Sequence, residues 1–400
     1  MSRPSRRSFI KGLAGAGVAG AVAGTAAAAA AADDSNASVP FHGDHQAGIV
    51  TPAQRHAAFA VFDVVAENKK ELTELLRTLT ERARFLTTGG TPTDPGITAP
   101  PNDSGVLGRT VPADSLTVTA GFGSSLFDDR YGLAGREPAH LRPMRTFPND
   151  DLDPAWCHGD LSLQLCADNV DTVLHALRDI ARHTRGAMQI RYRMDGFQNP
   201  PRPSGCPRNL MGFKDGTSNV DLNDAAQQRR LVWSAGGEPD WAVGGSYQVI
   251  RLIRMRVEFW DRVSLSEQEN MFGRRRDTGA PLDGIHEYDK PQYQRDPTGE
   301  VIPLTSHMRL ANPRTPQTAD SFFLRRPYNY DLGTDDVGDL DMGLIFVAYQ
   351  QDVKRQFEKV QERLIDEPLV DYITPFGGGY FFAPPGVRDS SDYLGRALLT

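Results

Sequence analysis

The sequence repeats one order of predicted elements on either side of a proline-rich segment, and this repeat most strongly constrains the fold. In the first part, short apolar runs typical of buried strands alternate with two amphipathic helical patterns. The predicted strands are residues 57–65, 116–123, 161–168 and 187–196. The predicted helices lie near 67–84 and around Val173, Leu174, Leu177 and Ile180.

The segment FQNPPRPSGCPRN (197–209) is the predicted joint between two halves, because proline and glycine interrupt regular structure. The strands predicted beyond it are 246–260, 342–351 and the run GYFFAPP; the helices begin at Ser266 and around Val353, Phe357, Val360 and Leu364. This second strand–helix–strand series predicts an α+β protein in which helices cover one face of an antiparallel sheet in each half. The expected domains are 57–200 and 201–400, and a large ligand commonly binds between such halves.

The first 32 residues have the pattern of an export signal rather than of a folded element. SRRSFIK (5–11) is a twin-arginine pattern, and a Gly/Ala-rich stretch follows it to an Ala-x-Ala site near 30–32. That stretch is long enough to span a bilayer, but its weak hydrophobicity favours a cleaved signal over a permanent anchor. We expect export by the twin-arginine machinery to a periplasmic, extracytoplasmic or secreted location, with 33–56 as an N-terminal extension. This route carries folded proteins, which suits a protein already loaded with a cofactor.

Charge and cysteine content exclude several classes of function. The formal net charge is −7 and becomes −11 without the four basic residues of the leader, whereas a nucleic-acid partner requires a basic face. Cys157, Cys166 and Cys206 allow at most one disulfide, whose pairing stays open. No Cys-x-x-Cys-His signal is present, which excludes a covalently attached c-type haem.

Three separate stretches hold residue types that can do chemistry. They are SHMRLANPR (306–314) with His307, GFKDGTSN (212–219) with Asp215, and FFLRRPYNYD (322–331) with Arg325 and Arg326. Alone, each has an ordinary explanation: a core or surface histidine, a turn aspartate that bonds its own backbone, and a solvated edge. No Gly-x-Ser-x-Gly elbow, Walker loop or His-Glu-x-x-His motif competes with them.

Together, and in this order, the three stretches resemble the dye-decolorizing peroxidase family. The resemblance extends from about residue 40 to the C-terminus through PFHGDHQAGI (40–49), LTVTAGFGSSLFD (116–128), WAVGGSYQVIRLIRMRVEFWDR (241–262) and DYITPFGGGYFFAPP (371–385). The twin-arginine leader is similar to that of the exported, deferrochelatase-like subgroup of this family.

The resemblance implies two ferredoxin-like halves in a dimeric α+β barrel-like fold, with one non-covalent haem b in the C-terminal half. It implies that His307 is the proximal ligand of the haem iron and that Asp371 accepts the other imidazole N–H. Asp215 and Arg325 are expected on the distal side, where Asp215 moves the proton of peroxide and Arg325 stabilises the leaving hydroxide. Further haem-edge residues are Gly216, Thr217, Ser218, Asn312, Pro313 and Arg314, the last as a propionate partner.

The implied activity is the oxidation of dyes, phenolics or other reductants by hydrogen peroxide through a ferryl intermediate. Because a carboxylate titrates near pH 4 unless its pKa is shifted, we expect an acidic optimum. Two alternatives stay open: an exported haem-handling protein for iron acquisition, and an exported binding module without haem. Pro327 stands where some subgroups have an asparagine, which favours the exported subgroup.

Bulky reductants cannot reach a buried haem edge, so electrons would travel through surface aromatic residues. The candidates are Trp233, Trp241, Tyr247, Tyr288 and Tyr293, each of which could equally be a core residue. The oligomeric state stays open, with a homo-oligomer among the expected forms.

Overall fold

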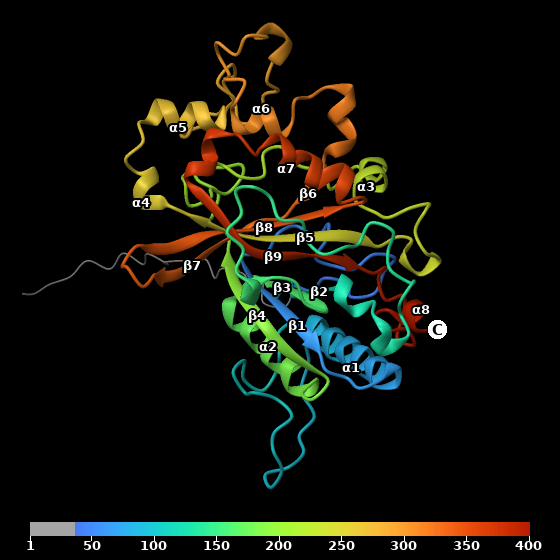
Figure 1. Ribbon diagram of the computed structural model, residues 1–400. Helices are drawn as coiled ribbons and strands as arrows, with labels where there is room; N and C mark the ends of the chain where they lie inside the picture. The colour runs from blue at the N-terminus through green and yellow to red at the C-terminus, as the bar shows by residue number, and fades with distance from the viewer. Residues whose placement is uncertain (1–36) are drawn as a thin grey trace, which may run out of the picture. The chain divides into compact units, whose positions relative to one another are not determined.

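Two antiparallel sheets, each with the strand order of a ferredoxin-like fold, are joined edge to edge in the computed structural model, which describes residues 37–400 (Figure 1). The predicted signal peptide, 1–32, lies outside the described residues, as does the start of the predicted extension. Among the residues described, no helix has the length and apolar character needed to cross a membrane.

The N-terminal sheet has the strand order β2-β3-β1-β4. Its strands are β1 (His56–Val64), β2 (Thr117–Gly123), β3 (Leu161–Ala167) and β4 (Met188–Phe197). Helices α1 (Lys69–Thr88) and α2 (Val170–His183) pack against each other and against this sheet (Figure 1). Asn68 caps α1 by accepting a hydrogen bond from the backbone N–H of Glu71, and the positive φ of Gly89 ends the helix.

The C-terminal sheet repeats this order as β9-β5-β8-β7. Its strands are β5 (Ser246–Met255), β7 (Tyr328–Thr334), β8 (Leu340–Gln350) and β9 (Ile373–Ala383), and the short β6 (Leu324–Arg325) pairs with β8. The helices of this half are α3 (Ala225–Leu231), α4 (Val257–Trp260), α5 (Leu265–Phe272), α6 (His307–Ala311) and α7 (Lys359–Arg363). The last helix, α8 (Arg396–Leu399), packs against α1 of the N-terminal half. A π-helical turn, Lys354–Glu358, leads directly into α7.

Pairing between the edges of the two sheets closes an eight-stranded barrel. β2 pairs with β9 through Phe122 and Phe382, and β4 pairs with β7 through Phe197 and Asn329. The barrel interior is filled by side chains that are at most 1% exposed, among them Phe59, Met194, Ile250, Ile345, Tyr349 and Phe381. The described residues belong to one compact unit. The prediction of two ferredoxin-like halves with α+β character is therefore confirmed.

One predicted strand is too long. The run 246–260 was expected to be a single strand, but β5 ends at Met255 and α4 follows at Val257–Trp260. Val257 and Trp260 lie three residues apart on one face of this helical turn and are both buried, and the Trp260 indole N–H donates to the Met211 carbonyl at 3.0 Å. An apolar run that is uniformly buried gives no period from which strand and helix can be told apart.

A buried ion pair fastens the long connection between β2 and β3 to the C-terminal sheet. Asp150, in this connection, receives two hydrogen bonds from the guanidinium of Arg251 on β5, and both side chains are at most 2% exposed. Asp150 also accepts a hydrogen bond from the backbone N–H of Phe147 at 2.8 Å. The pair therefore ties a loop of one half to a central strand of the other.

Replacing Asp150 with alanine should destabilise the protein by about 3–5 kcal/mol, because it leaves the Arg251 guanidinium buried without its partner. Urea unfolding at neutral pH measures this loss. The double variant Asp150→Leu/Arg251→Met removes both charges and should recover most of it. The control is Asp320→Ala, which breaks an exposed pair with Arg230 and should cost less than about 1 kcal/mol. Equal losses for Asp150→Ala and Asp320→Ala would contradict the role of the buried pair.

Candidate active site

A cavity of about 240 Å³ lies against the outer face of the C-terminal sheet, beneath the segments that cover it. Its sheet wall is made by alternate residues of three strands: Ile253, Met255, Leu344, Phe346, Ile373 and Pro375. Phe357, Val360 and Leu364, from the helical segment that follows β8, add further apolar surface. The walls are mostly apolar, so a few polar side chains determine the chemistry. His307, Asp215 and Arg325, predicted from three separate stretches, all line this one cavity.

His307 is the first residue of α6, and the end of α5 holds it in place. The preceding residue, Ser306, is fully buried against Gly273, which ends α5 with a φ of +79°. A Cβ at residue 273 would meet the Ser306 side chain at 3.0 Å, so both this close contact and the positive φ favour glycine. The ring of Phe272 lies 6.1 Å from the His307 ring, centroid to centroid.

The other end of α6 is held by α7. Arg363 donates hydrogen bonds to the carbonyl groups of Leu310 and Ala311, each at 2.9 Å. These carbonyls have no partner within so short a helix, and a cation near a helix C-terminus satisfies them. Pro313 cannot continue the helix, so the turn stops where the sequence predicted.

A buried carboxylate fixes the His307 ring, and it belongs to Glu367. The Nδ1 atom of His307 lies 2.7 Å from a carboxylate oxygen of Glu367, whose side chain is 3% exposed. Burial lowers the pKa of His307, but the charge and hydrogen bond of Glu367 raise it, and the net pKa lies above the ordinary histidine value. The His307 side chain is 34% exposed, and His307 is part of the lining of the cavity.

The prediction that Asp371 is the hydrogen-bond partner of His307 is wrong. Asp371 ends the short 3-10 helix Pro368–Asp371 and is exposed, whereas Glu367 immediately precedes that helix. The residue before the helix faces α6, and one 3-10 turn later the chain has rotated away from it. The side chain of glutamate is one methylene longer than that of aspartate, and from position 367 it reaches the His307 imidazole.

Asp215 lies on a loop that a second buried ion pair anchors. Lys214 contacts Glu287 at 2.5 Å, with side chains 3% and 8% exposed. Glu287 also accepts hydrogen bonds from the Cys206 backbone N–H at 3.0 Å and the Thr217 hydroxyl at 3.1 Å. Burial by itself raises the pKa of Glu287, but the hydrogen bonds from Lys214 and Cys206 outweigh it and lower that pKa below the ordinary value. One carboxylate thus joins both sides of the loop that presents Asp215.

Arg325 meets Asp215 directly. A guanidinium nitrogen of Arg325 lies 2.6 Å from the Asp215 carboxylate, and both residues line the cavity. Asn219 holds the backbone of Arg325 from both sides, because its carbonyl oxygen accepts from the Arg325 N–H at 2.9 Å and its amide donates to the Arg325 carbonyl at 2.8 Å. The cavity therefore contains a carboxylate and a guanidinium in contact.

Arg326 has a different environment, which distinguishes the two neighbouring arginines. It is 4% exposed and donates hydrogen bonds to the carbonyl of Pro52 at 3.3 Å and to the side chain of Gln54. Successive residues of a strand point to opposite faces, so Arg326 points away from the cavity that Arg325 lines. The sequence pattern could not tell Arg325 from Arg326, but in the structure only Arg325 of the two lines the cavity.

Most of the remaining predicted site residues also line the cavity. They are Gly216, Thr217, Ser218, Asn312 and Arg314, whereas Pro313 is not part of the lining. Gly216 has a φ of +112°, a conformation that favours glycine. Arg314 has a φ of +57°, which is uncommon for a residue with a side chain and indicates that the surrounding structure fixes its orientation.

Sequence reasoning missed Glu367, Glu287 and Phe272. Glu367 is one of two acids before Pro368, and Glu287 lies in a segment with no periodic pattern. Neither residue lies near its partner in the sequence, so only the tertiary fold reveals these contacts. Phe272 had a signal, since it ends a helical stretch just before Gly273, a typical helix C-terminus.

The other residues singled out for redox roles do not line this cavity. Trp233, Trp241, Tyr247, Tyr288 and Tyr293 are all outside its lining. Trp233, Trp241 and Tyr247 are at most 7% exposed, whereas Tyr288 is 62% exposed and its hydroxyl lies 3.6 Å from the Cys206 sulfur. Cys157, Cys166 and Cys206 are all free thiols in the structure.

Comparison with known proteins places this geometry in a family. Residues 46–198 match the family described as Dyp-type peroxidase, N-terminal, and residues 206–388 match Dyp-type peroxidase, C-terminal. The chain is 49% identical over 413 residues to a deferrochelatase of Escherichia coli, and the match covers 100% of this chain and 98% of the relative. A deferrochelatase of Shigella sonnei shows the same identity and coverage.

Solved structures agree with the sequence matches. A DyP-type peroxidase from Cellulomonas bogoriensis superposes with a TM-score of 0.82 at 38% identity and covers 92% of this chain and 99% of its own. Ferric DtpA from Streptomyces lividans gives a TM-score of 0.83 at 36% identity, with coverage of 91% and 98%. The chain belongs to the Dyp-type peroxidase family, and it is a haem peroxidase.

Proposed function

We propose that the cavity binds one non-covalent haem b, with the Nε2 atom of His307 as the proximal ligand of its iron. The hydrogen bond from Nδ1 to Glu367 leaves Nε2 as the free ligand atom and makes the imidazole more basic. The apolar walls suit a porphyrin, and Arg314 at the rim offers a bidentate partner for a propionate. Gly216, Thr217 and Ser218 are small enough for the backbone to approach the ring.

The observation that carries the proposal is the meeting of one carboxylate-bonded imidazole and one carboxylate–guanidinium pair in a single apolar cavity. Bound haem supplies the redox centre that accepts two electrons from organic reductants and passes them to hydrogen peroxide. The Asp215 carboxylate would accept a proton from one oxygen of hydrogen peroxide and deliver it to the departing oxygen. Arg325 stabilises the negative charge that develops on that departing oxygen. The substrates are hydrogen peroxide and a dye, phenolic or similar reductant.

A second candidate is the release of iron from haem, as part of iron acquisition. The observation that favours it is the 49% identity, over the whole chain, to a protein named deferrochelatase. Both functions use the same cavity. Incubation of the haem-loaded protein with a ferrous chelator and a reductant separates them, since iron release leaves fluorescent metal-free porphyrin and peroxidase action alone does not.

Export by the twin-arginine machinery is part of the same proposal. The pattern at Arg6 and Arg7 supports it, and a folded, haem-loaded protein is suited to this route. The protein would then work in a periplasmic, extracytoplasmic or secreted location.

Replacing Glu367 with glutamine should retain haem but lower peroxidase activity about 10- to 100-fold, because the neutral amide makes the imidazole less basic. The reduction potential of the bound haem should rise, since less negative charge then supports the ferric state, and spectroelectrochemistry measures this shift. Asp371→Asn is the matched control and should change neither quantity. An effect confined to Asp371→Asn would contradict the assignment of Glu367.

Asp215→Asn should slow the absorption change that follows mixing of the haem-loaded protein with peroxide, by about 100-fold or more, because the proton carrier is lost. Arg325→Leu should slow the same step through loss of charge stabilisation. Stopped-flow absorption measures both rates, and an unchanged Soret band before mixing shows that haem is still bound. Arg326→Lys is the control, and rates equal to those of the unmodified protein in all three variants would rule out these roles.

Glu287→Gln should destabilise the protein above about pH 4.5 and have a smaller effect in more acidic solution. The folded-state pKa of Glu287 is lowered, so its stabilising contribution is present above the unfolded-state pKa and is lost as the pH falls through the folded-state value. Thermal unfolding of both proteins between pH 3 and pH 7 should give a difference in Tm that narrows toward acid. A difference that widens toward acid would contradict the ion pair.

A further inference from the structure

The cavity of His307 carries two positive charges that no side chain of the described residues neutralises. The cationic side chains of its lining are Lys214, Arg251, Arg274, Arg314 and Arg325. Lys214, Arg251 and Arg325 each pair with a carboxylate. Within residues 37–400, Arg274 and Arg314 form no ion pair with any carboxylate. These two guanidinium groups are therefore the ones that a ligand can neutralise.

Arg274 is buried in the cavity wall with half of its guanidinium unused. It is 9% exposed, and its Nη1 atom donates to the carbonyl groups of Gly279 at 2.6 Å and Glu287 at 3.0 Å. Its Nε and Nη2 atoms form no hydrogen bond with the residues that the structure describes. Burial lowers the pKa of Arg274, and the positive charge of Arg314 lowers it further. A buried donor of this kind requires an acceptor, so the free nitrogens indicate a ligand.

The side chain next to these two arginines is a further donor. The hydroxyl of Tyr293 is buried and has no hydrogen-bond partner within residues 37–400. Burial raises the pKa of Tyr293 to about 12, although the nearby positive charges of Arg314 and Arg274 lower it. Arg309 lies over the Tyr293 ring, 4.9 Å from its centroid. Donors thus surround this end of the cavity without an acceptor among them, which favours an anion as the ligand.

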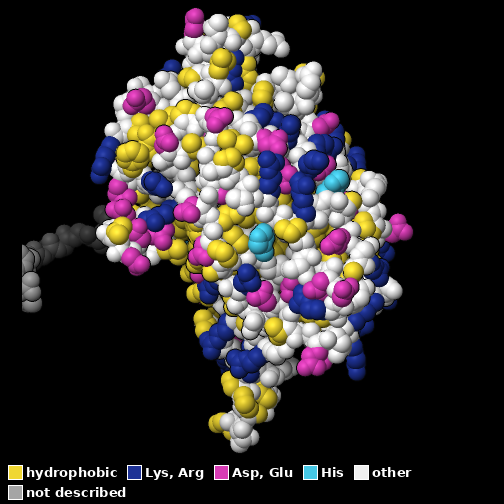
Figure 2. Space-filling model, in the orientation of Figure 1, with side chains coloured by type: hydrophobic (Ala, Val, Ile, Leu, Met, Phe, Trp, Pro, Cys, Tyr) yellow, Lys and Arg dark blue, Asp and Glu magenta, His cyan; other side chains and the backbone are white. Residues whose placement is uncertain are grey.

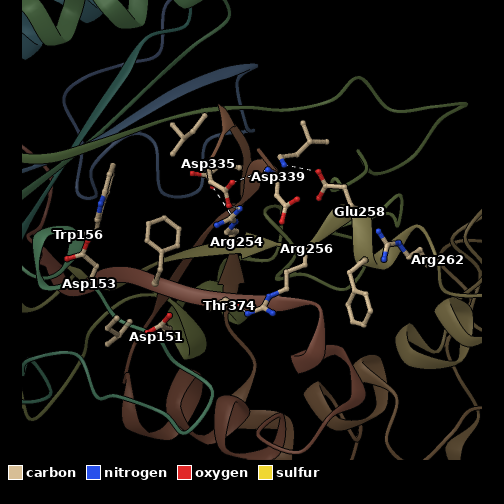
Figure 3. Close-up of a pocket in the computed structure, with 16 residues that line it drawn as sticks. Asp151, Asp153, Trp156, Arg254, Arg256, Glu258, Arg262, Asp335, Asp339 and Thr374 are labelled. Atoms are coloured by element: carbon tan, nitrogen blue, oxygen red, sulfur yellow. Dashed lines mark hydrogen bonds and ion pairs between the residues drawn. The ribbon is translucent and has the colours of Figure 1, made fainter. Parts of the chain in front are cut away.

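This balance of charge differs from that of the other large cavity and of the surface. Basic and acidic side chains are interspersed over the face shown in Figure 2. An open cavity of about 810 Å³, beside the ends of β5 and β9, is lined by six carboxylates against three guanidinium groups (Figure 3). Arg254, one of the three, is paired with Asp335 at 2.5 Å. The open cavity therefore disfavours an anion, whereas the cavity of His307 favours a ligand with two negative charges.

Arg274 also contacts the segment that anchors the Asp215 loop. Its hydrogen bond to the Glu287 carbonyl joins it to the residue whose carboxylate holds Lys214. Its other acceptor, Gly279, packs against the same lysine, since a Cβ at residue 279 would lie 2.6 Å from the Lys214 side chain. The position of the Arg274 guanidinium and the position of the loop therefore depend on the same few contacts.

We propose that Arg274 and Arg314 bind the two carboxylates of the haem, and that Arg274 thereby couples the loaded cofactor to the loop that presents Asp215. The inference rests on the haem binding proposed above and adds to it a second carboxylate partner. The Nε and Nη2 atoms of an arginine can hold one carboxylate between them. Arg82 holds Asp179 in this way elsewhere in the chain, at 2.7 and 2.9 Å.

Carboxylate binding is tested by a change in the ligand, which leaves the protein as it is. The protein is loaded with hemin or with hemin dimethyl ester, whose carboxyl groups carry no charge, and loss to excess apomyoglobin is followed by Soret absorption. The unmodified protein should lose the ester about 100-fold faster than hemin, because two charge-assisted contacts of about tenfold each are missing. Equal rates overturn the proposal. No Soret band with hemin would instead refute the haem binding on which it rests.

Arg274→Met tests which residue accounts for the difference. The ratio of the two loss rates should fall to about tenfold, because Arg314 alone then distinguishes hemin from its ester. Arg274→Lys retains a charge and should give an intermediate ratio. Arg275→Met is the matched control, since Arg275 is exposed and lines neither cavity, and it should keep the full ratio. A full ratio in Arg274→Met rules out Arg274 as a carboxylate partner.

The coupling to the Asp215 loop is tested by hydrogen–deuterium exchange, read by mass spectrometry on the two loaded forms. Residues 212–219 should exchange about threefold more slowly with hemin than with the ester, because a bound carboxylate fixes Arg274 and, through Glu287, the loop. Helix α1 is the internal reference and should exchange equally in both forms. In Arg274→Met the two forms should no longer differ over residues 212–219. Equal exchange of this segment in the two forms of the unmodified protein overturns the coupling.

Discussion

Closure of the barrel by short edge contacts is the constraint on which the rest of the structure depends. β2 meets β9, and β4 meets β7, through only a few residue pairs, yet these pairs join two sheets that would otherwise each have open edges. In the closed barrel, the inner faces of the strands pack into one core. The outer face of the C-terminal sheet is then the surface left for the cavity that His307, Asp215 and Arg325 line, and the covering segments form the remaining walls.

Those covering segments are held by polar contacts rather than by long helices. The helix that presents His307 has five residues, and it keeps its position because Gly273 admits Ser306 at one end and Arg363 bonds its carbonyls at the other. The loop that presents Asp215 depends on the buried Lys214–Glu287 pair. Residues that never touch the substrate thus define where the reacting groups lie, as is usual around catalytic and metal sites.

Much of the fold and part of the site could be predicted from the sequence. The repeated order of strands and helices indicated two α+β halves, because period and turn residues are local properties of the chain. His307, Asp215 and Arg325 were found through their motifs, and the structure places them in one cavity. The partner of His307 could not be found this way, since Glu367 and Asp371 differ only by one 3-10 turn that depends on packing against α6. The end of β5 was missed for a similar reason, because Val257 and Trp260 are apolar and buried in either conformation.

The alternation of residues along β5 and β9 has a consequence for anyone who would engineer this enzyme. Even-numbered positions such as 254, 256, 374 and 376 line an open cavity of about 810 Å³, and the odd-numbered positions between them line the cavity of His307. A library restricted to the even-numbered positions would change the lining of the open cavity and leave unchanged the β5 and β9 residues that line the cavity of His307. The pleat thus makes the linings of two cavities separately adjustable along the same two strands.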